Sequence, residues 1–265
     1  MEDNITAIRP PAVAGLFYPD NAEQLRTDVL RLLSLAKSTT TQPKAIIAPH
    51  AGYIYSGPIA ASAYATLISG AHTINRVVLL GPAHRIAFTG LAVPSTYAFA
   101  TPLGNVPVDQ ASIRQLLALP QVKRLDAAHA AEHSLEVHLP FLQTVLHAFS
   151  VVPLVVGRCQ PHAISEVLDR LWGGDETIII ISSDLSHYHD YITAQHMDRA
   201  TALAIEELHP AGVDAEEACG QLPINGLLLA AKAHRLQPHL LDLRNSGDTA
   251  GSRDRVVGYG AFIFQ

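Results

Sequence analysis

The chain has 265 residues, of which 48% are hydrophobic, and this is enough to bury one large core. Its formal charge of −6, without a Lys/Arg cluster, argues against a nucleic-acid or anionic-membrane surface. No apolar run approaches the ~20 residues that span a bilayer, and two cysteines do not make a disulfide framework.

Helices and strands alternate from the start of the chain. Apolar residues at helical spacing follow Asn21 and Asp109, both of a type that caps helices. Short β-branched runs indicate buried strands. The first half of the chain therefore predicts a helix over 21–33, a strand over 44–48, a helix over 59–68, a strand over 76–80, an edge strand within 91–101 and a helix over 109–119.

The second half continues the alternation. A helix is predicted from Ser134 to Leu146, with a kink or a later start at Pro140. Alternation of this kind predicts one α/β domain over residues 1–265, an α/β/α sandwich whose mixed, largely parallel sheet is covered on both faces. The other predicted elements are strands over 151–156 and 177–182, helices over 163–172, 191–208 and 227–233, and closing strands over 237–243 and 256–264.

No segment has the composition of an interdomain linker. Residues 38–43 and 173–175 are loop-length, and each is followed at once by a strand pattern. Residues 1–4 are acidic and lack the basic start of a secretory signal, which predicts a cytoplasmic protein. Cys159 and Cys219 are interpreted as small buried or half-buried residues.

Three of the predicted strands end in polar side chains that suit a metal or a substrate. His50, His84 and Asp184 each follow one of these strands, and His187 lies three residues beyond Asp184. In open α/β sheets, ligands bind outside the carboxyl ends of the strands. We therefore predict that these four side chains meet in one cleft.

His50 and His84 share a local setting. Each lies just past a strand, beside Pro or Gly residues that turn the chain, and not on a periodic apolar face. Two such imidazoles supply two neutral nitrogens to a divalent metal, and one carboxylate would complete a site with open positions. The alternative is that such a histidine hydrogen-bonds to a turn carbonyl.

The segment after the third strand holds Asp184 and His187. In a helical first turn, residues three apart lie side by side, so Asp184 would orient His187 as an acid/base. The alternative interpretation makes Ser182, Ser183 or Asp184 a helix N-cap and leaves the histidines solvated.

A fourth segment, from Glu132 to His138, gathers carboxylates and imidazoles on one short element. The leucines around Glu136 indicate a packed stretch, and packed charges need partners. The alternative is a capping box with a solvated acidic face. The loop over 247–251 either presents Asp248 to the same cleft or is simply a turn.

Motifs of several other enzyme classes are missing from the sequence. It has no His-Glu-x-x-His zinc-protease pattern, no Gly-x-Gly-x-x-Gly or Walker lysine for nucleotides, and no Gly-x-Ser-x-Gly nucleophile elbow. Zinc proteolysis by that route, nucleotide use and serine hydrolysis therefore have no motif support.

Several short motifs follow one another along nearly the whole chain. They are PAVAGLFYP (11–19), APHAGY (48–53), GPAH (81–84), EHSLEVHLP (132–140), SSDLSH (182–187), NSGD (245–248) and VGY (257–259). Several such motifs in the same order are highly specific, and together they resemble the Memo family, also called AmmeMemoRadiSam system protein B.

The resemblance implies a fold like that of the class III extradiol dioxygenases of the LigB type, which hold non-haem Fe(II) with two histidines and a glutamate. Carried over, His50 and His84 match the two metal-binding histidines, and His187 matches the acid/base histidine. Metal-binding eukaryotic relatives use a cysteine as third ligand, at a position that falls at about Thr249 here. This chain has Asp248-Thr249 there and no cysteine, so Asp248 becomes the candidate third ligand.

The first functional hypothesis is a metal-dependent, dioxygenase-like redox enzyme or metal-binding protein, with Fe(II) as the metal and copper as the alternative. Its substrate would be a small planar molecule. In this hypothesis the metal ligands are His50, His84 and Asp248, the residues that move protons are His187, Asp184, His138 and Glu136, and the residues that contact substrate are Tyr53 and Tyr188.

The second hypothesis is a metal-free binding module for a peptide, an anionic ligand or a partner protein. Eukaryotic family members are associated with signalling through phosphotyrosine peptides, and the missing third-ligand cysteine favours this reading. The family name also records association with a radical-SAM protein and an Amme-type protein, which are the predicted partners. This chain has no radical-SAM cysteine motif of its own.

Overall fold

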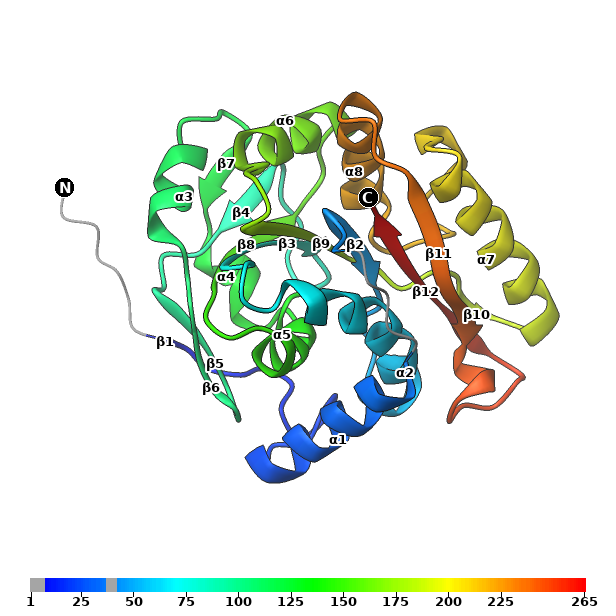
Figure 1. Ribbon diagram of the computed structural model, residues 1–265. Helices are drawn as coiled ribbons and strands as arrows, with labels where there is room; N and C mark the ends of the chain where they lie inside the picture. The colour runs from blue at the N-terminus through cyan, green and yellow to red at the C-terminus, as the bar shows by residue number, and fades with distance from the viewer. Residues whose placement is uncertain (1–7, 37–41) are drawn as a thin grey trace.

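The most apolar runs of the chain form the centre of the fold. Residues 8–36 and 42–265 are described by the computed structural model (Figure 1). Its strands are β1 (Ile8–Arg9), β2 (Ala45–Ala48), β3 (Arg76–Pro82), β4 (Leu91–Val93), β5 (Ala98–Thr101), β6 (Gly104–Pro107), β7 (Val122–Arg124), β8 (Ser150–Val156), β9 (Thr177–Ser182), β10 (His187–His189), β11 (Pro238–Asn245) and β12 (Val256–Phe264).

Helices alternate with these strands along the chain. The α-helices are α1 (Ala22–Leu35), α2 (Tyr53–Tyr64), α3 (Gln110–Leu116), α4 (Asp126–Ala130), α5 (Leu139–Val145), α6 (Pro161–Leu171), α7 (Tyr191–Glu206) and α8 (Gln221–Ala233). The short 3-10 helices are η1 (Ala65–Gly70), η2 (Glu136–His138), η3 (Pro210–Gly212) and η4 (Ser246–Asp248).

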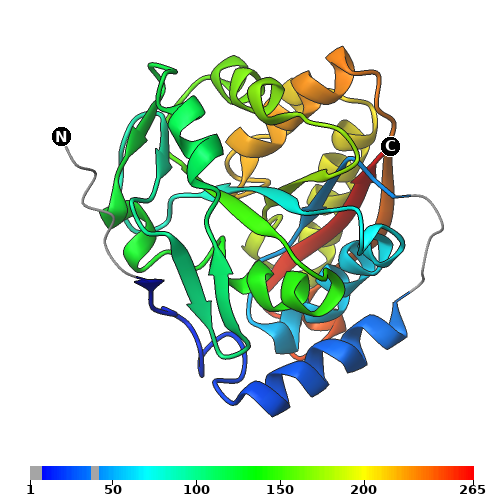
Figure 2. The same cartoon turned by 60° about the vertical axis from the view of Figure 1, so that its left-hand side comes forward.

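The large sheet has the strand order β10-β12-β2-β9-β3-β8-β4-β7, and β11 also pairs with β12. Strands β2, β9, β3 and β8 are parallel neighbours, whereas β12 and β4 run antiparallel to β2 and β8. A small sheet of β1, β5 and β6 lies at one end and comes forward in Figure 2. The predicted mixed, largely parallel sheet is confirmed.

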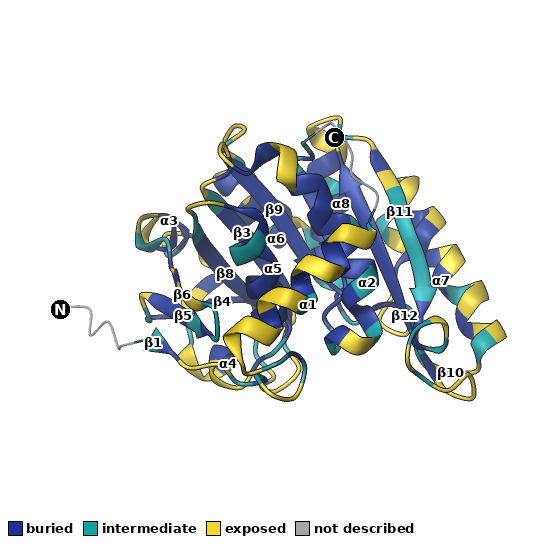
Figure 3. Cartoon of the chain, turned by 60° about the horizontal axis from the view of Figure 1, so that its bottom comes forward, coloured by how far each residue is buried: buried dark blue, intermediate teal, exposed yellow. Residues whose placement is uncertain are grey.

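Both faces of the large sheet are covered by helices. Helices α2 and α5 pack on one face with α1 outside them, and α6 and α8 pack on the other, while α7 packs against β11 and β12. The parallel strands between these layers are buried, and α1 exposes its outer side (Figure 3). This arrangement is the predicted α/β/α sandwich, because strands buried on both faces need a helical layer on each side.

Several element predictions are confirmed at residue level. The side chain of Asn21 accepts a hydrogen bond of 3.0 Å from the backbone N of Gln24, and Asp109 caps α3 by accepting one of 2.9 Å from Ser112 N. The strands predicted over 177–182 and 256–264 have the observed bounds of β9 and β12. These signals are local, so the sequence alone carries them.

Other helix starts were predicted only in part. Ser134 does not cap a helix, since its Oγ donates to the carbonyl of Pro82 at 2.9 Å. The later start predicted at Pro140 is confirmed, because α5 begins at Leu139 with Pro140 in its first turn. The helix predicted from residue 59 begins at Tyr53, and the one predicted from residue 227 begins at Gln221. These two helices therefore extend further toward the N-terminus than their apolar patterns indicate.

The helical turn predicted to place Asp184 beside His187 is absent from this described segment. Residues 183–186 are irregular, and His187 lies on β10, which pairs with β12. The cap of the next helix is instead Asp190, which accepts hydrogen bonds from Ile192 N and Thr193 N at the start of α7.

Two earlier observations fall outside the described residues. These are the acidic residues 1–4 and most of the predicted loop over 38–43, of which 38–41 are not described. In residues 8–36 and 42–265, no helix is both long and apolar enough to cross a membrane.

Candidate metal centre

Neighbouring parallel strands deliver the predicted side chains to one edge of the sheet. His50 follows β2, His84 follows β3, and Asp184 follows β9, which lies between them and pairs with both. The backbone N of His50 donates to Asp184 Oδ1 at 2.8 Å and so ties the ends of β2 and β9 together. The predicted convergence of these residues at the carboxyl ends of the strands is observed.

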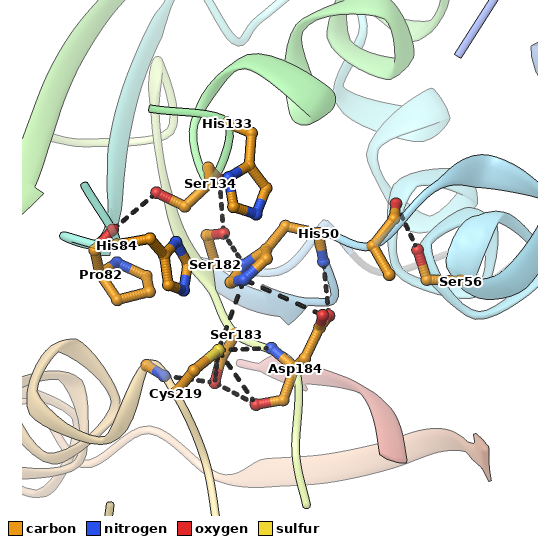
Figure 4. A network of polar contacts seen from close by, with 12 residues as sticks. His50, Ser56, Pro82, His84, His133, Ser134, Ser182, Ser183, Asp184 and Cys219 are labelled. Carbon is orange, nitrogen blue, oxygen red and sulfur yellow. Dashed lines mark hydrogen bonds and ion pairs between the residues drawn. The ribbon is translucent and has the colours of Figure 1, made fainter. Parts of the chain in front are cut away.

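Three histidines form the group that could hold a metal ion. One potential ligand atom from each of His50, His84 and His133 lies within 4.8 Å of the others. The ring centroids are 5.1 Å apart for His50 and His84, 5.5 Å for His50 and His133, and 4.7 Å for His84 and His133. Figure 4 shows the three rings gathered at one place.

A buried carboxylate orients His84. The Nδ1 of His84 lies 2.9 Å from Glu132 Oε1, and its backbone N donates to Glu132 Oε2 at 2.6 Å. A carboxylate accepts the proton of Nδ1, which leaves Nε2 as a free lone pair. Metal-binding histidines commonly have such a carboxylate behind them.

A chain of hydroxyls orients His50 in the same way. The Oγ of Ser182 donates to the carbonyl of Ser134 at 2.5 Å and lies 2.6 Å from His50 Nδ1. Because the hydroxyl proton is used on Ser134, the oxygen must accept from His50, so the proton of His50 is on Nδ1. Its Nε2 therefore carries the lone pair that a metal requires, and the alternative of a contact from His50 to a turn carbonyl is not observed in this described region.

Glu132 holds the third histidine segment in place. Its Oε1 accepts hydrogen bonds of 2.9 Å from the backbone N of His133 and of Ser134. Burial works to raise the pKa of Glu132, but the hydrogen bonds from His84 and Ser134 together outweigh it and lower that pKa to about 2. Gly81 permits the approach of this segment to β3, since a Cβ there would lie 2.8 Å from Ser134 Oγ. Glu132 is thus a fixed anion behind the group.

Burial disfavours the charged form of two of the three imidazoles, those of His50 and His133. Burial, followed by the charges of His84 and His133, holds the pKa of His50 well below its ordinary value. Burial also lowers the pKa of His133, against the opposing charge of Glu132. Neutral nitrogens are what metal coordination requires, so the donor set fits a first-row divalent metal.

The group faces a cavity of ≈ 640 Å³. His187 and Tyr188 line it, as do Asp184 and the two histidines predicted from the strand ends. Burial raises the pKa of Asp184, although the hydrogen bond from His50 N opposes the shift. Asp184 contacts His50, and no hydrogen bond joins it to His187 in the described part of the chain.

Glu136 and His138, predicted to move protons, do not line this cavity. Glu136 is fully buried: it pairs with Arg9 at 2.5 Å and accepts hydrogen bonds from the N of Ala12 and Val13 and from the hydroxyl of Tyr18. The Nδ1 of His138 lies 2.7 Å from the hydroxyl of Tyr64, and burial lowers the pKa of His138 to about 3. Glu136 therefore anchors the N-terminal segment, and His138 ties η2 to Tyr64 on α2.

Asp248, the predicted third ligand, is not brought to the histidines. Its Oδ1 accepts from the hydroxyl of Tyr191 at 2.5 Å, its Oδ2 accepts from Asn245 N at 3.0 Å, and it lines a different cavity. The carboxylate is thus used in the capping box of η4. His133 is the third member of the group, and its buried Nδ1 makes no hydrogen bond in the described residues but lies 3.4 Å from Glu132 Oε1.

Tyr53 is also placed away from the cavity. Its hydroxyl donates to the carbonyl of Val137 at 2.6 Å, and its side chain is buried at the start of α2. Tyr55, two residues on, lines the cavity together with Tyr188 and Tyr259. The sequence pattern identified the right segment but not which tyrosine faces the cleft.

Sequence reasoning left other neighbours of the site without a role. His133 stood in a segment that was singled out, and its position next to Glu132 was the available signal. Arg85 and Arg255 gave no motif signal, although both line the cavity. Cys219 is half-buried, as interpreted, but its Sγ lies 3.4 Å from His50 Nε2, and burial raises its pKa to about 12 (Figure 4).

The fold and the site define an α/β protein with a histidine-lined candidate metal centre at the carboxyl ends of parallel strands. A family model described as "Memo-like protein" matches residues 9–263. MEMO1 family proteins of Methanopyrus kandleri, Aquifex aeolicus and Metallosphaera sedula are 36%, 35% and 32% identical to it, each over 97% of this chain and 99% of the relative. The chain belongs to the Memo-like family.

Proposed function

We propose that the chain is a metal-dependent oxidoreductase with dioxygenase-like chemistry on a planar substrate. The observation that carries the proposal is the group of three imidazoles beside a cavity of ≈ 640 Å³. Fe(II) is the metal we propose and copper is the alternative, since imidazole nitrogens suit both. When bound, the metal supplies Lewis-acid and redox chemistry.

The side chains behind the histidines support this function over a structural one. Glu132 and Ser182 fix the tautomers of His84 and His50, so that each ring offers a neutral nitrogen without rearrangement. Asp184 holds the backbone of His50 and keeps that ring at the end of β2. Histidines that served only the core would not need a common orientation toward a cavity.

His187 is the residue we assign to proton transfer. It lies on β10 and lines the cavity, but it is not one of the three grouped imidazoles. A histidine in that position can take a proton from, or return one to, a substrate hydroxyl. Tyr55, Tyr188 and Tyr259 add aromatic surface against which a planar ring can pack.

Elemental analysis of protein purified without oxygen tests the metal assignment. Wild type is compared with His50→Ala and His133→Ala after reconstitution with Fe(II) or copper and removal of free metal. His72→Ala is the matched control, because His72 is exposed and lies against His147 away from the cavity. Wild type and the control should retain near-stoichiometric metal, and both site variants should lose it.

Two results would contradict the proposal. One is wild-type protein that takes up neither Fe(II) nor copper. The other is a His133→Ala variant that keeps the wild-type metal content, since metal would then be held without the third imidazole.

A further inference from the structure

The 3-10 helix η2 meets the hydroxyl of a buried tyrosine at each of its three residues. It follows His133 and Ser134 in the chain, and the three tyrosines are at most 7% exposed. A buried phenol loses an electron only if its proton has an acceptor, so the partner on η2 decides which tyrosine can be oxidised. The pairs are Tyr18–Glu136, Tyr53–Val137 and Tyr64–His138, with distances of 2.6, 2.6 and 2.7 Å from the hydroxyl oxygen to its partner.

The three partners differ in their capacity to take a proton. The partner on Val137 is a peptide carbonyl, which is a very weak base. The carboxylate of Glu136 already accepts from Arg9 and from two backbone nitrogens. The Nδ1 of His138 has Tyr64 as its one hydrogen-bond partner among the described residues. Tyr64 is therefore the tyrosine whose hydroxyl faces an otherwise unused base.

The hydrogen bond between Tyr64 and His138 has a defined direction. In the described part of the chain the Tyr64 hydroxyl has no other partner, so it donates to Nδ1 and the ring proton of His138 is on Nε2. Burial, followed by the charges of His50 and His133, lowers the pKa of His138 to about 3, so this ring is neutral. Because those charges act on it, His138 lies close to the histidine group. An oxidised phenol is a far stronger acid than an imidazolium, so its proton would still cross to Nδ1.

The surroundings of Tyr64 would protect a radical. Its side chain is fully buried. Its ring is stacked on Phe141, with centroids 4.9 Å apart and planes at 10°, and Phe141 in turn lies 5.0 Å from the ring of Tyr53. A radical on Tyr64 is thus shielded from solvent and from a second protein molecule.

We propose that Tyr64 is a one-electron donor to the metal held by the histidine group, with His138 as the acceptor of its proton. The proposal rests on the proposed function, because the metal passes the electron on. With hydrogen peroxide as the oxidant, the O–O bond breaks, and two electrons and two solvent protons convert it to two molecules of water. One electron comes from Fe(II), which becomes Fe(III), and the other comes from Tyr64. The phenol proton moves to His138 Nδ1 and leaves a neutral phenoxyl radical beside an imidazolium.

Electron paramagnetic resonance of Fe(II)-reconstituted protein, frozen rapidly after mixing with hydrogen peroxide, tests this assignment. Wild type should give an organic-radical signal whose shape changes when the protein carries ring-deuterated tyrosine. Tyr64→Phe keeps the ring that stacks on Phe141 and should lose the signal. Tyr97→Phe, at a position 47% exposed, is the matched control and should keep it.

Two further variants distinguish proton transfer from a structural role. His138→Asn offers Tyr64 an oxygen that accepts a hydrogen bond but does not hold a proton, so the radical signal should be lost although the hydroxyl keeps a partner. Tyr53→Phe removes a buried hydroxyl of the same cluster and should keep the signal. Equal losses of signal in Tyr53→Phe and Tyr64→Phe would overturn the inference, because any change in this part of the core would then have the same effect.

Iron content, measured on the same samples, separates the two proposals. Tyr64→Phe and His138→Asn should hold as much iron as wild type. Iron-loaded wild type that forms no radical dependent on Tyr64 would overturn this inference alone and leave the metal centre in place. Wild type that holds no iron would overturn both proposals. Loss of iron together with the radical in Tyr64→Phe would assign Tyr64 to the support of the site and would also overturn its role as an electron donor.

Discussion

The hydrogen bonds behind His50 decide which of its nitrogens is available. Ser182 Oγ donates to the carbonyl of Ser134 and accepts from His50 Nδ1, at 2.5 and 2.6 Å. Ser182 does not line the cavity, but it sets the tautomer of His50, which does. Such outer contacts matter because a metal ligand must have both the right proton position and the right ring orientation.

Replacing this hydroxyl should weaken metal binding without removing a ligand. Ser182→Ala is expected to lower metal affinity about 10- to 100-fold, because the His50 ring loses the partner of its Nδ1 proton. Competition with a chelator measures the affinity. Ser112→Ala removes a buried hydroxyl that donates to Asp109 at the start of α3, outside the histidine group and its cavity, and should keep wild-type affinity. An equal loss of metal affinity in Ser182→Ala and Ser112→Ala would mean that the fold is destabilised in general.

Single residues also show where sequence reasoning succeeds and fails. His50, His84, Asp184 and His187 could be predicted because each follows a recognisable strand or lies within a few residues of its end. The third position could not, because the approach of the Glu132–Ser134 segment to β3 is a tertiary contact. The family resemblance pointed to about Thr249 and so to Asp248 beside it, whose carboxylate is used by Tyr191 and Asn245 in a local turn.

At the scale of elements, α7 and the outer strands meet around one buried acid. Asp198 on α7 accepts a hydrogen bond of 3.0 Å from Ser186 N, just before β10. Gly258 on β12 leaves room for it, since a Cβ there would lie 2.1 Å from Asp198 Oδ2. Burial raises the pKa of Asp198 to about 6, against the hydrogen bond from Ser186 N.

This shift predicts a stability that falls with pH. The folded-state pKa of about 6 lies above the ordinary value of 3.8, so the folded state binds the proton more tightly than the unfolded state does. The protonated Asp198 carboxyl makes its full contribution to the stability of the fold below the ordinary pKa, and this contribution is lost as pH rises through the folded-state pKa. Asp198→Asn removes this titration. As pH rises from 4 to 7, the free energy of unfolding of the variant should therefore increase by up to ~3 kcal/mol relative to that of wild type.

Urea unfolding at a series of pH values measures the difference. Asp175→Asn, at an exposed position in the loop before β9, is the control and should follow the wild-type curve. If the unfolding free energies of Asp198→Asn and wild type change in parallel with pH, the Asp198 carboxyl does not titrate between pH 4 and pH 7.

Elements were predictable to different degrees for a physical reason. Helix α1 and strands β9 and β12 carry their own signals, a cap and apolar periodicity, so their positions follow from nearby residues. Strand β10 has no such signal. It exists because His187 pairs with Val257 on β12, a partner far along the chain.

For the whole molecule, strand order is what turns separate segments into a site. Strand β9 lies between β2 and β3, so the ends of three strands that are far apart in the sequence become neighbours. Alternation of helices and strands predicts such a sheet but not this order, which depends on which strand each crossover joins. The histidine group is therefore a property of the folded chain and should be absent from the unfolded one.

Metal binding should accordingly stabilise the entire fold. A ligand that binds only the folded state stabilises it by about 2.7 kcal/mol at a hundredfold excess over its Kd, which for a chain of this size raises Tm by about 5–10 °C. Thermal unfolding of wild type should show this rise with Fe(II) and its reversal by a chelator. Because the three imidazoles come from segments joined only by folding, His133→Ala should show no rise, while His72→Ala should match wild type. A rise of equal size in His133→Ala would mean that the metal binds elsewhere on the molecule.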